Sequence, residues 1–279
     1  MDRKKITITD LNRKKKNKEK ITMLTAYDYP FASFLDQAEI DMILVGDSLG
    51  MVVLGYESTV PVTMDEMIHH CKAVRRGSKY ALLVGDMPFM SYNISKEEAI
   101  RNAGRFMKEA GCDAVKLEGG LEVVQTVKAI IDAGIPVMAH LGLTPQTVSK
   151  MGGFKIQGKD VETARGILEA SLAMEKVGVF SVLFECVPDK LAGLITSKLK
   201  VPTIGIGAGA ECDGQVLVTH DLLGLFEKFI PKFVKQYTKL SGSILEALGN
   251  FKKEVSSGDF PAKEHTFTMK EDVLKELEG

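Results

Sequence analysis

The sequence predicts an α/β protein whose strands close into a (β/α)₈ barrel. Eight short apolar runs alternate with helix-like segments through short links, which favours parallel strands joined by crossover helices. Eight is also the number of strands at which such a sheet closes. The length of 279 residues is close to the roughly 250 that are typical of this fold. An open, doubly wound sheet is the alternative.

The expected strands are mostly continuous apolar runs, as in strands that are buried on both faces. Thr63–Glu66 and Ser95–Glu98 have the capping-box pattern that opens a helix. The expected strands are Ile21–Ala26, Met42–Val45, Ala81–Val84, Ala114–Leu117, Ile135–Ala139, Val179–Phe184, Thr203–Ile206 and Val216–Val218. The expected helices are a leading helix within Lys4–Lys20, then Pro30–Ala38, Thr63–Arg76, Ser95–Ala110, Leu121–Ala133, Asp160–Val177, Leu191–Leu199, and helices between Asp221 and Val255, with Pro231 opening a new one.

The chain contains no linker, repeat or low-complexity segment, so we expect one domain over residues 1–279. It should begin with a short helix and end in a polar tail at about residues 256–279, which packs on a neighbour or frays. A dinucleotide-binding fold is excluded. Gly205–Gly209 reads G-x-G-x-G late in the chain, whereas that fold needs G-x-G-x-x-G after the first strand.

Composition excludes several classes of function. A formal net charge of −1 gives no reason to expect a nucleic-acid or membrane partner. No stretch reaches about 18 apolar residues and no secretory signal is visible, so we expect a cytoplasmic protein without a membrane span. The four cysteines form no CxxC pair, which fits a reducing compartment. The basic run Arg13–Lys16 is either a phosphate-binding arm or, as we favour, a solvated helix face.

The ends of the strands hold the chemically informative residues. In a barrel the carboxyl ends of all strands open on one face, so residues far apart in the sequence meet there. Asp47 and Asp86 both follow Val-Gly at a strand end, and Glu185 follows an apolar run. The set that we expect at this face is Asp47, Ser48, Asp86, Lys116, Glu118, His140 and Glu185.

Converging carboxylates would repel each other unless a cation or protons intervened. Oxygen ligands of this kind suit Mg²⁺ or Mn²⁺, and Mg²⁺ usually takes one or two protein carboxylates and keeps waters that substrate oxygens can replace. Lys116 lies inside an apolar strand, where an unpaired charge is costly, so we expect an ion pair. Each residue also has a structural interpretation: Asp47 and Asp86 as helix caps or Asx turns, Glu118 as a cap, and His140 as a core histidine.

These residue types favour metal-assisted chemistry on a 2-oxo acid. A divalent metal would chelate the carboxylate and keto oxygens of the acid and would stabilise an enolate. Glu185 is the expected general base that removes the adjacent C–H proton, because apolar surroundings raise the pKa of a carboxyl group. The enolate would then attack an electrophile.

The same residues lie in stretches that closely resemble the ketopantoate hydroxymethyltransferase family. The likeness covers nearly the whole chain up to about Phe267, and it departs from the family at Ala210, where proline is often found. The matching stretches are Leu24–Asp28, Val45–Gly50, Val84–Pro88, Val115–Gly120, Ala139–Gln146, Glu185–Pro188, Gly205–Gly209, Asp213–Val218 and Pro231–Lys235.

The resemblance implies a (β/α)₈ barrel of the phosphoenolpyruvate/pyruvate type. It implies an enzyme that transfers a hydroxymethyl group from 5,10-methylenetetrahydrofolate to 3-methyl-2-oxobutanoate, using Mg²⁺ and a Mg²⁺-stabilised enolate. The product would be 2-dehydropantoate (ketopantoate), which is used to make pantothenate. Members of the family are cytoplasmic and typically assemble as homodecamers.

The resemblance also implies roles for individual residues. Asp47 and Asp86 would bind the metal, and Glu118 would join them directly or through water. The residues implied in binding the oxo acid are Asp47, Ser48, Asp86, Lys116 and His140, and Glu185 would accept the proton.

Two other functions are consistent with such residues. One is a metal-dependent lyase or mutase that acts on a 2-oxo acid without folate, as in the phosphoenolpyruvate mutase and isocitrate lyase group. The Lys-Lys-Cys-Gly signature associated with that lyase is absent from the sequence. The other is a barrel that has lost catalysis and serves in binding or assembly, but such a protein would be expected to lack acids that are all present here.

Overall fold

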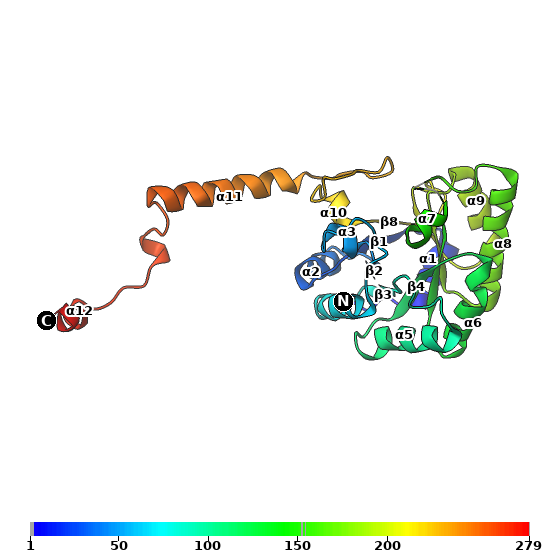
Figure 1. Ribbon diagram of the computed structural model, residues 1–279, viewed down its shortest axis with the longest axis horizontal. Coiled ribbons are helices and arrows are strands. Elements are labelled where there is room, and N and C mark those ends of the chain that lie inside the picture. Colours follow the sequence, from blue (N-terminus) through cyan, green and yellow to red (C-terminus); the bar gives the residue numbers. More distant parts are fainter. Residues whose placement is uncertain (1–2, 152, 154, 279) are drawn as a thin grey trace.

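The computed structural model describes residues 3–151, 153 and 155–278. Its centre is a closed barrel in which the strands follow one another in chain order, and β8 pairs with β1 (Figure 1). All neighbouring strands are parallel, so the expected (β/α)₈ barrel is confirmed and the open sheet is wrong. The strands are β1 (Ile21–Thr25), β2 (Met42–Val45), β3 (Leu82–Asp86), β4 (Ala114–Glu118), β5 (Val137–Gly142), β6 (Ser181–Glu185), β7 (Thr203–Ile206) and β8 (Gly214–Leu217).

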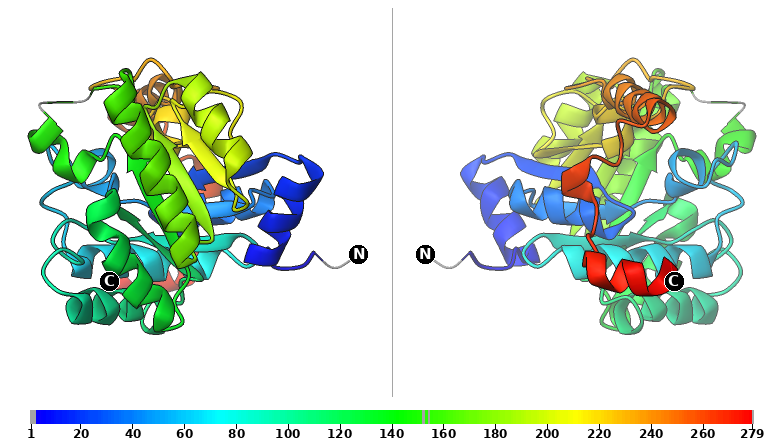
Figure 2. Two further views of the ribbon diagram at one scale, coloured as in Figure 1. Left: turned by 90° about the vertical axis from the view of Figure 1, so that its right-hand side faces the viewer. Right: turned by 90° about the vertical axis from the view of Figure 1, so that its left-hand side faces the viewer.

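Helices pack around most of the barrel, as the two views in Figure 2 show. Thr63 and Glu66 form the predicted capping box at the start of α4. The α-helices are α1 (Ile8–Asn17), α2 (Tyr29–Gln37), α3 (Leu49–Val52), α4 (Met64–Gly77), α5 (Lys96–Lys108), α6 (Val124–Asp132), α7 (Val148–Met151), α8 (Val161–Val177), α9 (Asp189–Lys198), α10 (Thr219–Leu222), α11 (Leu240–Ser257) and α12 (Glu271–Glu278). The 3₁₀ helices are η1 (Leu121–Val123), η2 (Pro145–Thr147) and η3 (Lys263–His265).

Side chains alternate along each strand and thereby build two apolar layers. Met42 and Leu44 of β2 point into the barrel and pack with residues such as Met138. Ile43 and Val45 of the same strand pack outward among the surrounding helices. Because both faces are covered, the strands read as continuous apolar runs in the sequence.

The leading helix α1 lies at the amino-terminal end of the barrel. Lys14 Nζ and Lys15 Nζ lie 2.5 and 2.6 Å from carboxylate oxygens of Asp41 and Asp213, the residues just before β2 and β8. Leu11 of the same helix is fully buried. These two lysines therefore pair with acids of the protein itself, so neither a phosphate-binding arm nor a solvated face describes them.

The chain after α10 departs from the prediction of continuous helices. Residues 223–239 are irregular, and no helix begins at Pro231. The cause is a tertiary contact, because Phe233 packs against the backbone of Gly207, where an added Cβ would lie 2.8 Å from Phe233 Cδ1. This contact holds the segment over the end of the barrel, and the helix α11 begins only at Leu240.

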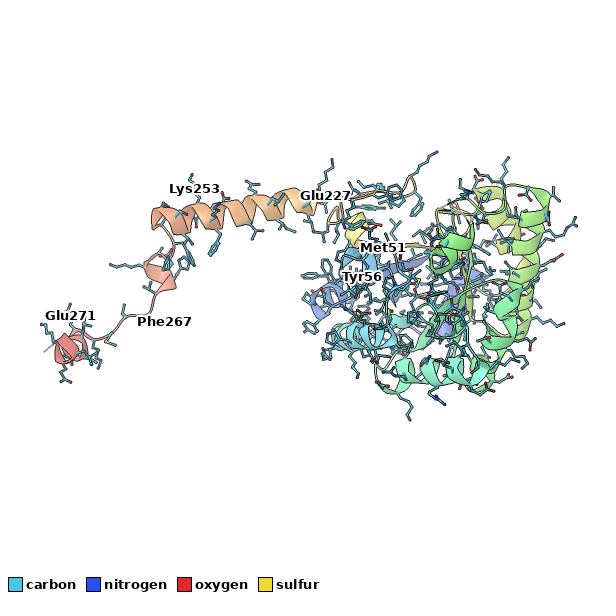
Figure 3. All side chains as sticks on the ribbon, viewed as in Figure 1. Met51, Tyr56, Glu227, Lys253, Phe267 and Glu271 are labelled. Atoms are coloured by element: carbon cyan, nitrogen blue, oxygen red, sulfur yellow. The ribbon has the colours of Figure 1, made fainter. Side chains whose placement is uncertain are left out.

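Helix α11 and the residues that follow it form an arm that projects away from the barrel (Figure 1). None of the residues of α11 is buried, and Figure 3 shows Lys253, Phe267 and Glu271 standing clear of the barrel. The barrel meanwhile lacks helices on one side. Residues 207–213, all of which are described, link β7 to β8 without a helix, and β8 is followed by the four-residue α10.

Asp36 joins α2 to the chain that enters β3. Its carboxylate accepts hydrogen bonds from the backbone N–H groups of Lys79, Tyr80 and Ala81 at 3.2, 3.0 and 3.0 Å. Burial alone would raise the pKa of this carboxyl group. The three N–H donors outweigh burial, and the pKa of Asp36 is lowered.

We predict that Asp36→Asn lowers the free energy of unfolding by about 1–3 kcal/mol at pH 7, because the amide cannot accept all three bonds. A lowered pKa contributes stability above the unfolded pKa and loses it as the pH falls through the folded one. The difference from the unmodified protein should therefore shrink below about pH 4. Urea unfolding measured at several pH values tests this, with Asp132→Asn in an exposed Lys128–Asp132 pair as the control. Equal losses in the two variants would contradict the assigned role.

Candidate active site

All seven residues predicted from the sequence line one cavity of about 630 Å³ at the carboxyl ends of the strands. The alternation of side chains explains why they meet. Five of the seven lie two or four positions along a strand from a residue that points into the barrel, so they point inward as well. These five are Asp86, Lys116, Glu118, His140 and Glu185, and the inward-pointing residues of the same strands are Val84, Ala114, Met138 and Leu183.

The strand register then sets which of these side chains are neighbours. Asp86 of β3 lies opposite Lys116 of β4, and Glu118 of β4 lies opposite His140 of β5. Glu185 ends β6 opposite Gly142. Parallel pairing thus assembles the site one strand at a time around the barrel.

Lys116 and Asp86 form a buried ion pair. Lys116 Nζ donates to both carboxylate oxygens of Asp86, at 2.7 and 2.6 Å, and the two side chains are 4% and 2% exposed. Burial opposes the charge on Lys116, but the nearby carboxylates of Asp86 and Glu118 raise its pKa, so the ammonium stays charged. The predicted ion pair of this intrastrand lysine is therefore present.

Asp47 lies beside this pair, and its carboxylate accepts a hydrogen bond from a neutral amide, that of Gln146. Its backbone N–H donates to Asp86 Oδ2 at 3.2 Å, which brings the two acids together. The pKa of Asp47 is raised well above its usual value, first by burial and then by repulsion from Asp86 and Glu118. Burial also raises the pKa of Asp86, although Lys116 works against it.

His140 lies between two acids. Its Nδ1 is 3.2 Å from Glu118 Oε1, and its Nε2 is 3.3 Å from Glu185 Oε2. Burial lowers the pKa of His140, but Glu118 and Glu185 raise it to about 9, so the ring is cationic at neutral pH. Burial likewise opposes ionisation of Glu118, yet His140 and Lys116 lower its pKa. The two ring nitrogens of His140 thus each face an acid of the site.

Gln146 and Tyr92 also belong to the site, and sequence reasoning assigned them no role. Gln146 Nε2 donates to Asp47 Oδ2 at 2.9 Å and to Met87 O at 3.0 Å. The backbone N–H of Gln146 donates to Glu118 Oε2 at 3.1 Å. Tyr92 Oη donates to Gln146 Oε1 at 2.6 Å. Gln146 therefore orients two of the predicted metal ligands, and its presence in the matched stretch Ala139–Gln146 was the one available signal.

Ser48 is held by a residue that the sequence did not single out. The hydroxyls of Tyr27 and Ser48 lie 2.8 Å apart. Tyr27 itself is 2% exposed and follows β1, so it borders the site from the β1 side. Burial raises the pKa of Tyr27, which keeps its hydroxyl protonated.

The charge of the acid cluster fits a divalent cation. Among the seven predicted residues, four carboxylates face two cationic groups, Lys116 and His140. Burial and then repulsion from Asp86 and Glu118 raise the pKa of Asp47. Within the described part of the chain, no group of three or more His, Cys, Asp or Glu side chains is arranged to hold a metal ion. Mg²⁺ needs fewer, because it usually binds one or two protein carboxylates and completes its shell with water and substrate oxygens. Asp47 and Asp86 fit that requirement.

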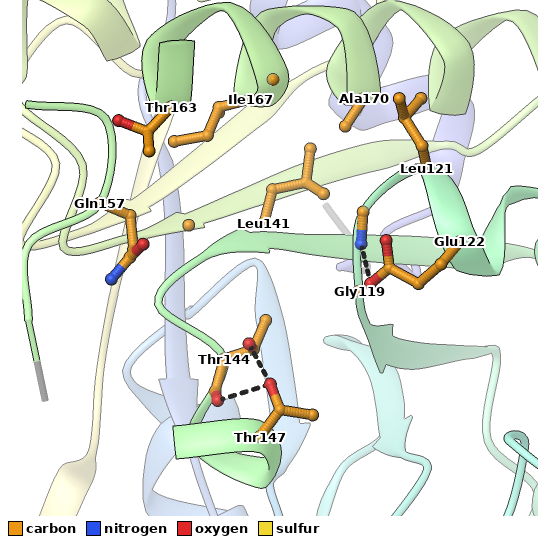
Figure 4. Close-up of a pocket in the computed structure, with 13 residues that line it drawn as sticks. Gly119, Leu121, Glu122, Leu141, Thr144, Thr147, Gln157, Thr163, Ile167 and Ala170 are labelled. Carbon is orange, nitrogen blue, oxygen red and sulfur yellow. Dashed lines mark hydrogen bonds between the residues drawn. The ribbon is translucent and has the colours of Figure 1, made fainter. Parts of the chain in front are cut away.

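A second, smaller cavity of about 460 Å³ lies outside the barrel between β5 and α8 (Figure 4). Small residues such as Gly142, Gly166 and Ala170 line it. Thr144 and Thr147 close one side, with their hydroxyl oxygens 2.6 Å apart. None of the seven predicted residues lines this cavity, so it is separate from the acid cluster.

The described residues include no helix that is long and apolar enough to cross a membrane. Several solved structures share the fold. A phosphonopyruvate hydrolase aligns with a TM-score of 0.62 at 11% identity, covering 97% of this chain and 94% of that one. A 2,3-dimethylmalate lyase of the PEP mutase/isocitrate lyase superfamily aligns with a TM-score of 0.58 at 14% identity, covering 93% and 91%. At this identity the likeness concerns the fold alone.

Sequence comparisons are more specific. The family model described as ketopantoate hydroxymethyltransferase matches residues 5–263. The 3-methyl-2-oxobutanoate hydroxymethyltransferase of Syntrophomonas wolfei is 62% identical over 98% of this chain and 99% of its own. The proteins of that name from Heliobacterium modesticaldum and Carboxydothermus hydrogenoformans are 58% and 53% identical, over 98% and 99% of this chain and 99% and 100% of their own. By this similarity along its whole length, the chain belongs to the ketopantoate hydroxymethyltransferase family.

Proposed function

We propose that this protein transfers a hydroxymethyl group from 5,10-methylenetetrahydrofolate to 3-methyl-2-oxobutanoate, giving 2-dehydropantoate for pantothenate synthesis. One observation carries the proposal: all seven residues that match the family line a single cavity. That cavity combines a surplus of carboxylates, a buried ammonium group and a general-base candidate, which are the groups that enolate chemistry on a 2-oxo acid needs.

Glu185 is proposed as the general base. Its side chain is 16% exposed, against 2% for Asp86 and for Glu118, so it is more accessible than these two carboxylates. Glu185 takes the proton from C3 of the oxo acid, and the C–H electron pair moves toward the keto group. A C–C bond then forms between C3 and the one-carbon unit, and the two C–N bonds that held this unit to the folate break. Water supplies the hydroxyl oxygen. The proton held by Glu185 and the two protons of water end on the new hydroxyl and on the two nitrogens of the departing tetrahydrofolate.

Asp47 and Asp86 are proposed to hold Mg²⁺, and Glu118 to reach it directly or through water. When bound, the ion supplies positive charge where the keto oxygen becomes negative. Ser48, Lys116 and His140 are proposed to bind the oxo acid together with the two aspartates. Lys116 and His140 offer cationic N–H donors to its carboxylate and keto oxygens.

A metal-dependent lyase or mutase acting on a 2-oxo acid without folate is the second candidate, because it would need the same acids for a metal ion and the same general base. An inactive barrel is disfavoured because every matched position is occupied. Dependence of turnover on folate separates the first two activities. The four cysteines are free thiols, three of them buried, which supports a cytoplasmic location.

We predict that the purified protein with Mg²⁺, methylenetetrahydrofolate and 3-methyl-2-oxobutanoate forms 2-dehydropantoate, detected by mass spectrometry. Absence of this product would reject the proposal. Glu185→Gln should lower kcat by about 10²–10⁴-fold, because general-base catalysis is lost. The same variant should bind the oxo acid but exchange its C3 proton with D₂O far more slowly. Glu122→Gln, on the second cavity, is the matched control and should keep full exchange.

We predict that Gln146→Ala weakens Mn²⁺ binding by about 10–100-fold, because Asp47 loses the donor that orients it. Electron paramagnetic resonance of free Mn²⁺ measures this without turnover. Gln125→Ala, on the exposed face of α6, is the matched control. Unchanged Mn²⁺ affinity in a folded Gln146→Ala protein would show either that Asp47 is not a metal ligand or that its orientation by Gln146 does not affect metal binding.

The chain is proposed to be one barrel domain that assembles with further copies of itself, as the homodecamer of the family implies. The apolar residues Ile244, Leu245, Leu248, Phe251 and Val255 are 44–68% exposed along α11. Such a helix owes its stability to a packed face, and none of its residues is buried by the described part of this chain. Two arms exchanged across a two-fold axis, each about 27 Å long, offer the standard interface of about 1,200–2,000 Å². The uncovered β7–β8 side of the barrel is the proposed receiving surface.

We predict that Leu248→Asp with Phe251→Asp lowers the mass of the assembly measured by light scattering, because two charges enter the proposed interface. Asn250→Asp introduces the same residue on the same helix and should leave the mass unchanged. A wild-type protein that is monomeric, or a double variant that keeps the full mass, would contradict docking through α11.

A further inference from the structure

The cavity has a second half that the chemistry described above does not use. The acids come from β2 to β6, whereas the opposite wall is formed by β7, β8 and the irregular segment 223–239. This wall is apolar and largely aromatic. Its cavity-lining members are Ile206, Val218, Phe226, Phe229, Pro231 and Phe233.

Asp221 is the one acid on this wall. It belongs to α10, directly after β8, and lines the cavity. It is only partly exposed, and burial raises its pKa to about 6. Among the described residues, none forms a hydrogen bond or ion pair with its carboxylate. A half-buried carboxylate in an apolar wall without a partner is costly, so the site is suited to a ligand that donates hydrogen bonds.

The surroundings of Asp221 are well fixed. The segment 223–239 is closed at its base, where Tyr237 N–H donates to Leu222 O at 2.9 Å and Leu240 N–H donates to Leu223 O at 3.0 Å. Its tip is held by the packing of Phe233 on Gly207. The wall is therefore formed in advance, as binding pockets for small molecules usually are.

Asp221 is also connected to the oxo-acid half of the cavity. Asp221, Asp47 and Ser48 line the same cavity. Burial raises the pKa of Tyr27, and the charges of Asp221 and Asp47 raise it further. Tyr27 Oη in turn contacts Ser48 Oγ at 2.8 Å. A ligand on Asp221 would consequently lie next to a substrate on Ser48 and Asp47.

We propose that Asp221 and the aromatic wall bind the reduced pterin ring of the folate co-substrate, an inference that rests on the proposed function. The pyrimidine edge of that ring carries a ring N–H and an adjacent amino group. Two parallel donors of this kind match the two oxygens of one carboxylate. The flat ring fits between aromatic side chains. Lys155 and Lys232, exposed at the mouth, suit the carboxylates of the glutamyl tail.

The arrangement has a consequence for the reaction. With the pterin on the β7–β8 side and the oxo acid on the β2–β6 side, the one-carbon unit lies between them. Both reacting carbons are then held in one cavity of limited size, and bringing reactants together in this way is a large part of catalysis.

Tetrahydrofolate binding, measured by calorimetry without the oxo acid, tests the proposal. Asp221→Asn is nearly isosteric and should weaken tetrahydrofolate binding by about 10–100-fold. Glu57→Gln, an exposed acid at the same end of the barrel, should leave binding unchanged. A tetrahydrofolate analogue with a methyl group in place of the 2-amino group should bind the unmodified protein as weakly as Asp221→Asn binds tetrahydrofolate. Unchanged affinity in Asp221→Asn would overturn the proposal.

A second experiment measures exchange of the C3 proton of 3-methyl-2-oxobutanoate with D₂O in the presence of Mg²⁺. This exchange needs no folate, so it tests the proposed function separately from the proposed pterin site. Asp221→Asn should keep the exchange rate of the unmodified protein. If the unmodified protein shows no exchange, the proposed function fails. If Asp221→Asn loses exchange together with folate binding, Asp221 serves the oxo-acid half and its assignment to the pterin is overturned. Phe233→Leu, which alters the wall and not the acid, should weaken tetrahydrofolate binding and also keep exchange.

Discussion

The buried pair of Lys116 and Asp86 is the interaction on which the site depends. An ammonium group inside a barrel strand is tolerated only with a close partner, since removing one member of such a pair leaves an uncompensated buried charge. The register of β3 against β4 supplies that partner at 2.6 Å. The same ammonium then offsets part of the repulsion between Asp47, Asp86 and Glu118. The site is thus a set of charges that none of the strands could bury alone.

Much of this could be predicted from the sequence, for one physical reason. In a parallel barrel the side chains alternate strictly and all carboxyl ends open on one face, so strand ends can be compared without knowing any distance. Asp86, Lys116 and Glu185 were accessible in this way, and Asp47 by its position just after the end of β2. Their positions follow from local pattern and topology, and the closed barrel follows from the count of apolar runs.

Other features could not be predicted, because they depend on contacts between distant segments. In the sequence Gln146 looks like an ordinary loop residue. Only in the structure does its amide lie 2.9 Å from the carboxylate of Asp47. Asp221 falls in a stretch that reads as helix, and nothing local marks it as facing a cavity. Pro231 is a sound helix start by propensity, yet Phe233 packs on Gly207 and holds the segment open. Tertiary contacts of this kind routinely override propensity.

The irregular segment 223–239 links the aromatic wall of the cavity to the helix α11. Its first part covers the cavity with Phe226, Phe229 and Phe233, and its last residues lead directly into α11. Backbone hydrogen bonds from Tyr237 and Leu240 tie the base of the arm to α10, the helix that carries Asp221. Docking of α11 on another copy would therefore restrain the aromatic wall from its far end. A wall held at both ends loses less freedom when a ligand binds, so assembly and co-substrate binding would depend on the same seventeen-residue connection between α10 and α11.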